Sequence, residues 1–103
     1  MTSTTTSAPF GFMVHNEGDH VGVAVEDVGI GRFQAYYMDS RREVDVEALE
    51  AIPLGHKIAL KDLPADSDVI EYGVRVAKTR RAIKRGELVH VHNVRSARWE
   101  ASQ

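Results

Sequence analysis

The feature that most constrains the fold is a succession of short stretches with alternating apolar residues, most of them ended within a few positions by glycine or proline. Residues 21–25 carry valine at every second position, and residues 43–47 alternate in the same way. Further stretches of this kind are 12–15, 33–38, 56–60, 69–72 and 74–76. A period of two is typical of β-strands. The sequence therefore predicts an all-β domain, with single helical turns expected at most at 61–63 and, as an alternative to a strand end, at 46–51.

One pattern recurs at the corners between these stretches. Ile52-Pro-Leu-Gly55 and Ile83-Lys-Arg-Gly86 each begin a segment of the form Ile-x-x-Gly-x-x-apolar-x-apolar, and Val28-Gly-Ile-Gly31 repeats its beginning. Each copy is a turn that leads into a strand. Because the copies are few and unevenly spaced, they predict similar corners around a pseudo-symmetric centre rather than a solenoid.

The 103 residues suffice for one small domain with a modest core. We interpret residues 1–9, which are rich in serine and threonine, as a disordered leader, residues 10–95 as the domain, and residues 96–103 as a C-terminal tail in which Trp99 is a candidate for docking. The sequence contains no cysteine, which excludes disulfides, thiolate metal ligands and a cysteine nucleophile. It also lacks a signal-peptide pattern and any apolar run near the ~18 residues that span a membrane, which favours a cytoplasmic protein.

Charge is unevenly distributed along the chain. Residues 1–51 carry a net charge of −6 and residues 52–103 carry +4. The positive half is suited to attract an anionic substrate or an acidic partner surface. Aromatic residues are not interleaved with the basic stretch 78–85, and the net charge of the whole chain is −2, so we do not expect a nucleic-acid binder.

The main candidate for function is the stretch 86–94, Gly-Glu-Leu-Val-His-Val-His-Asn-Val. If this stretch is a strand, His90 and His92 leave the same face, roughly 6–7 Å apart from two steps of a ~3.3 Å rise. Such a pair can contact a metal, an anion or a substrate carboxylate, or can simply be the polar surface of a half-buried strand. Two imidazoles are an incomplete ligand set for most metals, so a metal here would need ligands from elsewhere.

These segments resemble the small SAF-type (β-clip) domain of the altronate and galactarate dehydratase family. The resemblance covers about residues 14–94 and is greatest to the separately encoded small, or alpha, subunit of sulfolactate sulfo-lyase-like two-component lyases. The segments that carry it are Val14-His15, Gly18-Asp19, residues 21–25, Ile52-Pro-Leu-Gly-His-Lys-Ile-Ala-Leu-Lys-Asp-Leu63, Val69-Ile-Glu-Tyr-Gly73 and Ile83-x-x-Gly-Glu-x-Val-His-Val-His-Asn-Val94. The Pro-Leu-Gly-His-Lys and Val-His-Val-His-Asn blocks are rather specific in combination.

The resemblance implies a lyase module that eliminates water or sulfite from a sugar acid or a sulfonated 2-hydroxy acid. A much larger companion subunit would hold most of the catalytic machinery, including iron or another divalent metal, and the small domain would lie over that site. Such an elimination needs a base for the proton next to the carboxylate, a positive centre, and an acid for the leaving group. Histidine suits the acid or base role because its ordinary pKa of about 6.5 lies near working pH.

Carried over residue by residue, the resemblance implies two catalytic histidines that are also possible metal ligands, His90 and His92. It also implies four substrate contacts, namely His56, Lys57, Asn93 and His15. Each has an ordinary alternative: His56 can stabilise the corner after glycine, and Lys57 can lie on a solvated strand face. Leu88 stands where relatives often carry a histidine or an aromatic residue, and residues 78–81 are unusually basic, which leaves the substrate open.

Two other functions stay open. The chain can be a free-standing β-clip module that binds a sugar acid or another anion without chemistry, or a structural adaptor in an assembly. The small-subunit hypothesis predicts a large partner and an exposed apolar surface. Tyr72 is expected in the core or at an interface rather than as a proton donor. The binding-module hypothesis predicts a monomer with direct ligand affinity, and a homo-oligomer is also compatible with the sequence.

Overall fold

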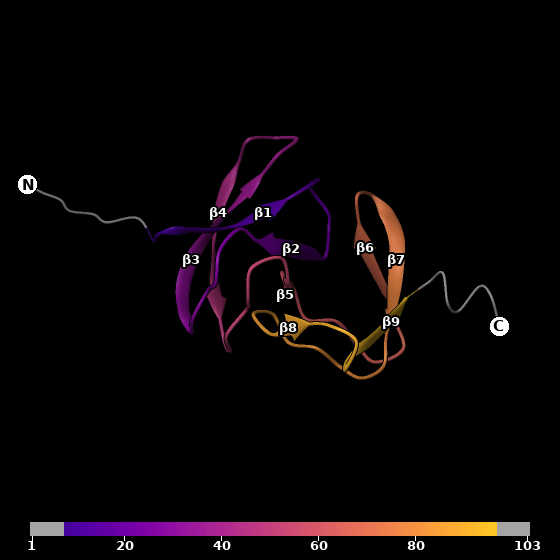
Figure 1. The fold of residues 1–103 in the computed structure, drawn as a ribbon. Helices are drawn as coiled ribbons and strands as arrows, with labels where there is room; N and C mark the ends of the chain where they lie inside the picture. The colour runs from indigo at the N-terminus through magenta and orange to yellow at the C-terminus, as the bar shows by residue number, and fades with distance from the viewer. Residues whose placement is uncertain (1–7, 97–103) are drawn as a thin grey trace, which may run out of the picture.

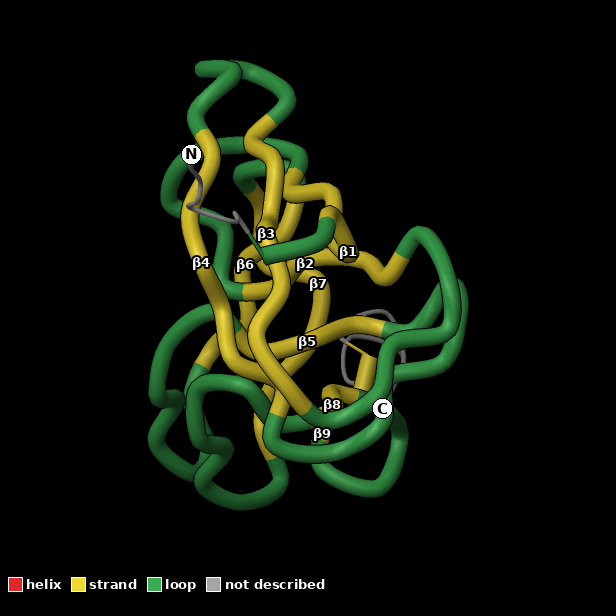
Figure 2. Tube along the Cα trace, turned by 90° about the vertical axis from the view of Figure 1, so that its left-hand side faces the viewer, coloured by secondary structure: helices red, strands yellow, loops and turns green. Residues whose placement is uncertain are grey.

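The computed structural model describes residues 8–96, which form strands and loops without a helix (Figure 2). Those residues accordingly contain no helix that could cross a membrane. The predicted all-β class is therefore confirmed. The strands are β1 (Phe10–Val14), β2 (Val21–Ala24), β3 (Gly31–Tyr37), β4 (Glu43–Ala48), β5 (Lys57–Ala59), β6 (Asp68–Glu71), β7 (Val74–Thr79), β8 (Leu88–Val89) and β9 (Val94–Ser96).

The strands form a six-stranded sheet in the order β4-β3-β1-β2-β5-β8 and a three-stranded sheet in the order β6-β7-β9. All neighbours are antiparallel except β1 and β3, which pair in parallel. In Figure 1 the β6–β7 hairpin stands beside β2 and β5, and β3 and β4 lie on the other side of them. Strand β9 ends one residue inside the segment predicted as a tail, and Trp99 lies outside the described residues.

The corners of the fold pair with one another. Val28 and Ile52 exchange two backbone hydrogen bonds of 2.9 and 2.8 Å, and Leu63 and Ile83 exchange two of 2.7 and 2.8 Å. The fourth residue of each corner has a positive φ, namely Gly31 (148°), Gly55 (83°), Asp66 (58°) and Gly86 (94°). The pairing agrees with the predicted pseudo-symmetric arrangement and adds a fourth corner, residues 63–66. This fourth corner stands in place of the helical turn expected at 61–63, and the prediction of that turn is wrong.

The six-stranded sheet curls until the segment before β8 meets the end of β4. Leu49 N donates to Gly86 O at 2.9 Å, and Leu88 N donates to Glu50 Oε2 at 3.0 Å. Strand β4 runs through Ala48, so the alternative of a helical turn from residue 46 is wrong. These contacts join β4 and β8, the two outer strands of the sheet, and so bring residues that are distant in sequence close together.

Two groups of buried side chains hold the fold together. The first fills the curled sheet and includes Phe12, Val14, Val46, Ile52 and Ile58. The second joins the two sheets and consists of Val21, Ala59, Leu63, Val69, Ala77, Ile83 and Val89. Because this second group comes from β2, β5, β6, β7, β8 and the corners, it fixes the β6–β7 hairpin over the β5–β8 edge of the larger sheet.

Candidate functional site

The register between β5 and β8 brings two histidines together. Lys57 pairs with Val89 and Ile58 with Leu88, so His56 and His90 lie at the same level where the two strands end. Their ring centroids are 4.8 Å apart with planes inclined by 54°. The internal repeat in the sequence aligns His56 with Glu87 instead, and for that reason it did not indicate this pair.

The strand predicted for residues 86–94 is interrupted at the histidines. Strand β8 ends at Val89, and His90 O accepts hydrogen bonds from the backbone N–H groups of Asn93 and Val94, both at 3.0 Å. Residues 91–93 thus form a turn. The expectation that His90 and His92 leave the same face of one strand is wrong.

The side chain of Asn93 is the reason for this turn. It is 2% exposed; its Oδ1 accepts a hydrogen bond from His90 N at 2.9 Å, and its Nδ2 donates one to Leu88 O at 2.7 Å. A short amide side chain that bonds nearby backbone groups competes with strand pairing. Asn93 therefore fixes the position of His90, while its predicted role as a substrate contact stays a prediction.

A cleft of about 230 Å³ lies between the β5–β8 edge and the β6–β7 hairpin. Its charged or titratable lining side chains are Lys57, Glu71 and His90, and the remaining lining is valine and alanine. His90 is exposed to solvent, and Lys57 is about two-fifths exposed. His92 is exposed in its turn and does not belong to this lining, so the structure joins His90 with His56 and Lys57 rather than with His92.

A second cleft, of about 320 Å³, shares Glu71 with the first. It holds His15 and Tyr72, whose ring centroids are 4.5 Å apart in an edge-to-face arrangement, and its other lining residues are methionines and valines. His15 Nδ1 lies 2.8 Å from Asn16 Oδ1. Of the predicted substrate contacts, His15 therefore lies in a different cleft from Lys57, with Glu71 between them.

Sequence reasoning missed Glu71 as a functional candidate. Its side chain is 5% exposed, and its Oε1 lies 3.9 Å from Lys57 Nζ. Burial raises the pKa of Glu71 above its usual value; Lys57 and His15 pull this pKa down, and Asp19 pushes it further up. The period of two along β6 puts Glu71 on the same face as the buried Val69, and that was the available signal.

The turn that carries Tyr72 is held by a second buried carboxylate, Asp19. Its oxygens accept hydrogen bonds from the backbone N–H groups of Asn16 (3.1 Å), Tyr72 (3.0 Å) and Gly73 (3.1 Å). Tyr72 has a φ of 58° and is 54% exposed, so it is a surface residue in this chain and not a core residue. The turn after β1 is in this way tied to the turn after β6.

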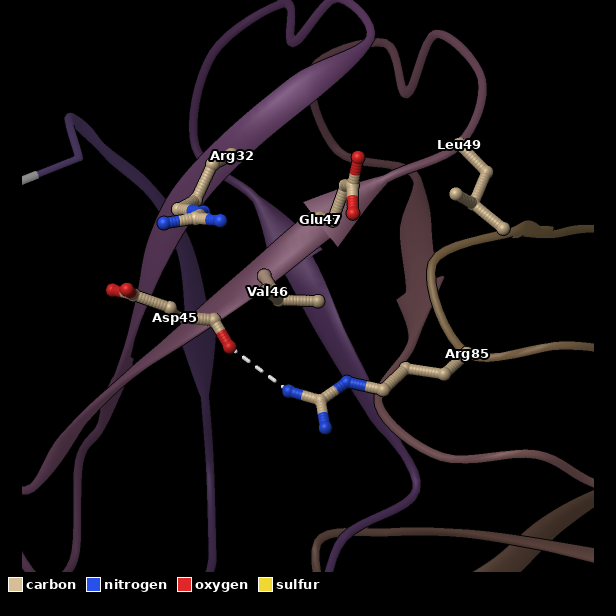
Figure 3. A pocket seen from close by; sticks show the side chains of 6 residues that line it. All are labelled: Arg32, Asp45, Val46, Glu47, Leu49 and Arg85. Carbon is tan, nitrogen blue, oxygen red and sulfur yellow. Dashed lines mark hydrogen bonds between the residues drawn. The ribbon is translucent and has the colours of Figure 1, made fainter.

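A third and larger cleft, of about 490 Å³, lies along β4 and is shown in Figure 3. It is lined by Arg32, Arg85, Asp45 and Glu47, and Arg85 Nη2 donates a hydrogen bond to the main-chain oxygen of Asp45 at 2.9 Å, whereas the Asp45 side chain points away from Arg85. The lining therefore carries two positive and two negative side chains. None of the residues predicted from the sequence lines this cleft, and we do not assign a site to it.

The described residues contain no group of three histidine, cysteine or acidic side chains placed to hold a metal ion. His56 and His90 would provide two ligands, which is short of the three or four that most protein metal sites use. The prediction that His90 and His92 ligate a metal gains no support from their placement. These residues do not fit a complete metal centre.

The sequence of this chain is similar to those of known proteins. The family described as "Altronate/galactarate dehydratase SAF domain" matches residues 10–97. The chain is 44% identical over 90 residues to the (2R)-sulfolactate sulfo-lyase subunit alpha of Chromohalobacter salexigens, covering 85% of this chain and 96% of that subunit. It is 36% identical over 84 residues to galactarate dehydratase (L-threo-forming) of Escherichia coli, covering 82% of this chain and 15% of the relative. With altronate dehydratase of Bacillus subtilis the identity is 31% over 86 residues, covering 82% and 16%.

Proposed function

Because this chain belongs to the altronate/galactarate dehydratase SAF domain family, we propose that it is the small subunit of a two-component lyase. The reaction is elimination of water or sulfite from a sugar acid or a sulfonated 2-hydroxy acid. The observation that carries the proposal is the match along 96% of a protein named subunit alpha of a sulfo-lyase. Two dehydratases contain the same region as about 15% of a much longer chain. A large catalytic subunit is therefore the partner of this chain.

The cleft of Lys57, Glu71 and His90 supports a role in substrate binding and proton transfer. The Lys57 ammonium binds the carboxylate or sulfonate of the substrate through a charge-assisted hydrogen bond. His90 moves a proton at the substrate or leaving group, for which an imidazole is well suited near neutral pH. The ring of His56 orients that of His90, and His92 stays in the proposal as a second catalytic histidine that meets the partner subunit.

Any metal of the assembled enzyme, iron or another divalent ion, belongs mainly to the large subunit in this proposal. The described residues of this chain do not supply a full ligand set. The contribution of the small subunit is then to close the active site, bind the anionic end of the substrate and exclude water. From that division of labour we expect the isolated chain to show no turnover.

The proposal is tested by purifying the chain at its native level from its own organism and identifying what accompanies it. We expect a stoichiometric dehydratase-like large subunit, and the pair should eliminate water or sulfite from a sugar acid or sulfolactate. If the chain comes out alone, and adding a large subunit yields no lyase activity, the proposal is wrong. Direct sugar-acid binding by that lone chain would establish the free-standing binding module.

Single variants then separate the histidines within the active pair. His90→Ala should lower turnover by about 10²–10⁴-fold, the usual contribution of a general acid or base. His56→Gln should have a smaller effect, and His92→Ala reports whether the turn histidine takes part. A complex that keeps wild-type turnover with both His90 and His92 replaced by alanine would refute the catalytic assignment.

A further inference from the structure

Glu71 is a buried carboxylate with an incomplete set of partners. Within residues 8–96 no hydrogen bond to its side-chain oxygens is found, and the nearest cationic group is Lys57 Nζ at 3.9 Å, beyond hydrogen-bond distance. A buried ionised carboxylate is costly unless it is both paired and hydrogen-bonded. Such a group lining a cleft is an incomplete site that a ligand or a proton would complete.

The charged groups around Glu71 come from several elements. Lys57 faces it from β5, His15 from the end of β1, Asp19 from the loop before β2, and His90 shares its cleft after β8. Strand β7 contributes Val76 and Ala77 to the cleft, and the charged side chains of that strand, Arg75 and Lys78, contact Asp68 and Asp66. Lys57 is thus the nearest positive group, and its side chain is about two-fifths exposed to solvent.

We propose that Lys57 and Glu71 form a proton-coupled anion site that this chain provides without a partner. An incoming carboxylate or sulfonate binds the ammonium group of Lys57 in place of Glu71, and Glu71 takes up a proton from solvent. The class of anion rests on the proposed function, whereas the site rests on the geometry of this chain. An anion at Lys57 would place two negative groups side by side, and in that arrangement one carboxyl is held protonated. The neutral Glu71 then donates a hydrogen bond to the bound anion.

Proton coupling fixes how affinity depends on pH. If one proton is bound with each anion, the association constant falls by about tenfold per pH unit above the pKa of free Glu71. Below that pKa the dependence levels off, because Glu71 is already protonated. A plain salt bridge to Lys57 would show no slope that depends on residue 71, so its pH profile would be the same in the wild type and in Glu71→Gln.

The experiment is calorimetric titration of the full chain, without a partner, using tartrate as a hydroxylated dicarboxylate probe. Titration in two buffers with different heats of ionisation should show uptake of up to one proton per bound tartrate. Glu71→Gln should keep tartrate binding but abolish the uptake and flatten the pH profile. Lys57→Gln should lose binding, while Lys61→Gln, an exposed lysine outside the cleft, should bind as wild type.

Several results would overturn the proposal. Uptake that persists in Glu71→Gln would come from a histidine such as His90, and absence of tartrate binding would remove the site altogether. If Glu71→Gln does not fold, the carboxyl resonance of Glu71 in the wild-type chain decides, because its pKa must rise when tartrate saturates the site. Lyase activity of the two-subunit complex is measured separately, so either proposal can fail while the other stands.

Discussion

Replacing Gly86 by alanine tests the corner that positions β8 and therefore His90. Gly86 has a φ of 94°, and a Cβ built there would clash with the carbonyl oxygen of Glu47 and touch the side chain of Leu49. The left-handed backbone alone costs an alanine about 1–2 kcal/mol. The overlap with a backbone oxygen can be relieved only by moving β4 from the corner, which weakens the 2.9 Å bond from Leu49 N to Gly86 O and adds about 1 kcal/mol or more. We expect a loss of about 2–4 kcal/mol in the free energy of unfolding.

Gly55→Ala is the matched control for this substitution. Gly55 occupies the same place in its corner, has a φ of 83°, and has no atom within 4 Å of the position of an added Cβ. It should lose only the conformational part, about 1–2 kcal/mol. Urea denaturation of the two variants and the wild type, followed by circular dichroism, measures the difference. Equal losses in both variants would refute the contact between Gly86 and Glu47 as a determinant of the corner.

Three further predictions concern titratable groups, of which Asp19 and Glu71 are buried and His20 is half-buried. Asp19→Asn replaces one accepting oxygen at the β6–β7 turn by a donor and should lower the free energy of unfolding by about 1–3 kcal/mol in urea denaturation. Burial lowers the pKa of His20, whose Nδ1 accepts a backbone hydrogen bond from β6. Because the unfolded chain then binds the proton of His20 more tightly than the folded chain, the free energy of unfolding should fall as pH drops below about 6.5. His20→Gln should flatten this dependence in thermal melts across pH. Because the pKa of Glu71 is raised, the folded chain binds its proton more tightly than the unfolded chain, and stability should fall as pH rises above 4.5 through that raised pKa. The dependence should be absent in Glu71→Gln melts.

The strands were predictable from sequence because each has an alternating pattern that depends only on its own residues. The alternation across residues 89–92 was misleading for the same reason, since Asn93 closes a turn through two side-chain hydrogen bonds that hydropathy does not encode. The corner at 63–66 was hidden because Asp66 adopts the positive φ that glycine has in the other three. Local patterns therefore gave the fold class and most strands, and failed where one polar side chain determines the backbone.

The site depended on information that is not local. His56 and His90 meet because of the register between β5 and β8, and a shift by one residue would separate them. Glu71 is buried only because the β6–β7 hairpin packs over β5 through the second group of core side chains. The resemblance to a family identified the histidines and Lys57 without their arrangement, and it gave no reason to single out Glu71.

The residues of the candidate site share a place in the fold that explains their chemistry. His15 follows β1, Lys57 begins β5, Glu71 ends β6 and His90 follows β8. Strand ends are where side chains leave the packed sheet while the backbone beside them is still held by pairing, so their groups are both positioned and accessible. Glu71 is the exception, because its carboxyl group is buried without a hydrogen bond from the described residues. No hydrogen bond among the described residues accounts for a buried carboxylate at this position, and this is the strongest reason to look for its function in ligand binding.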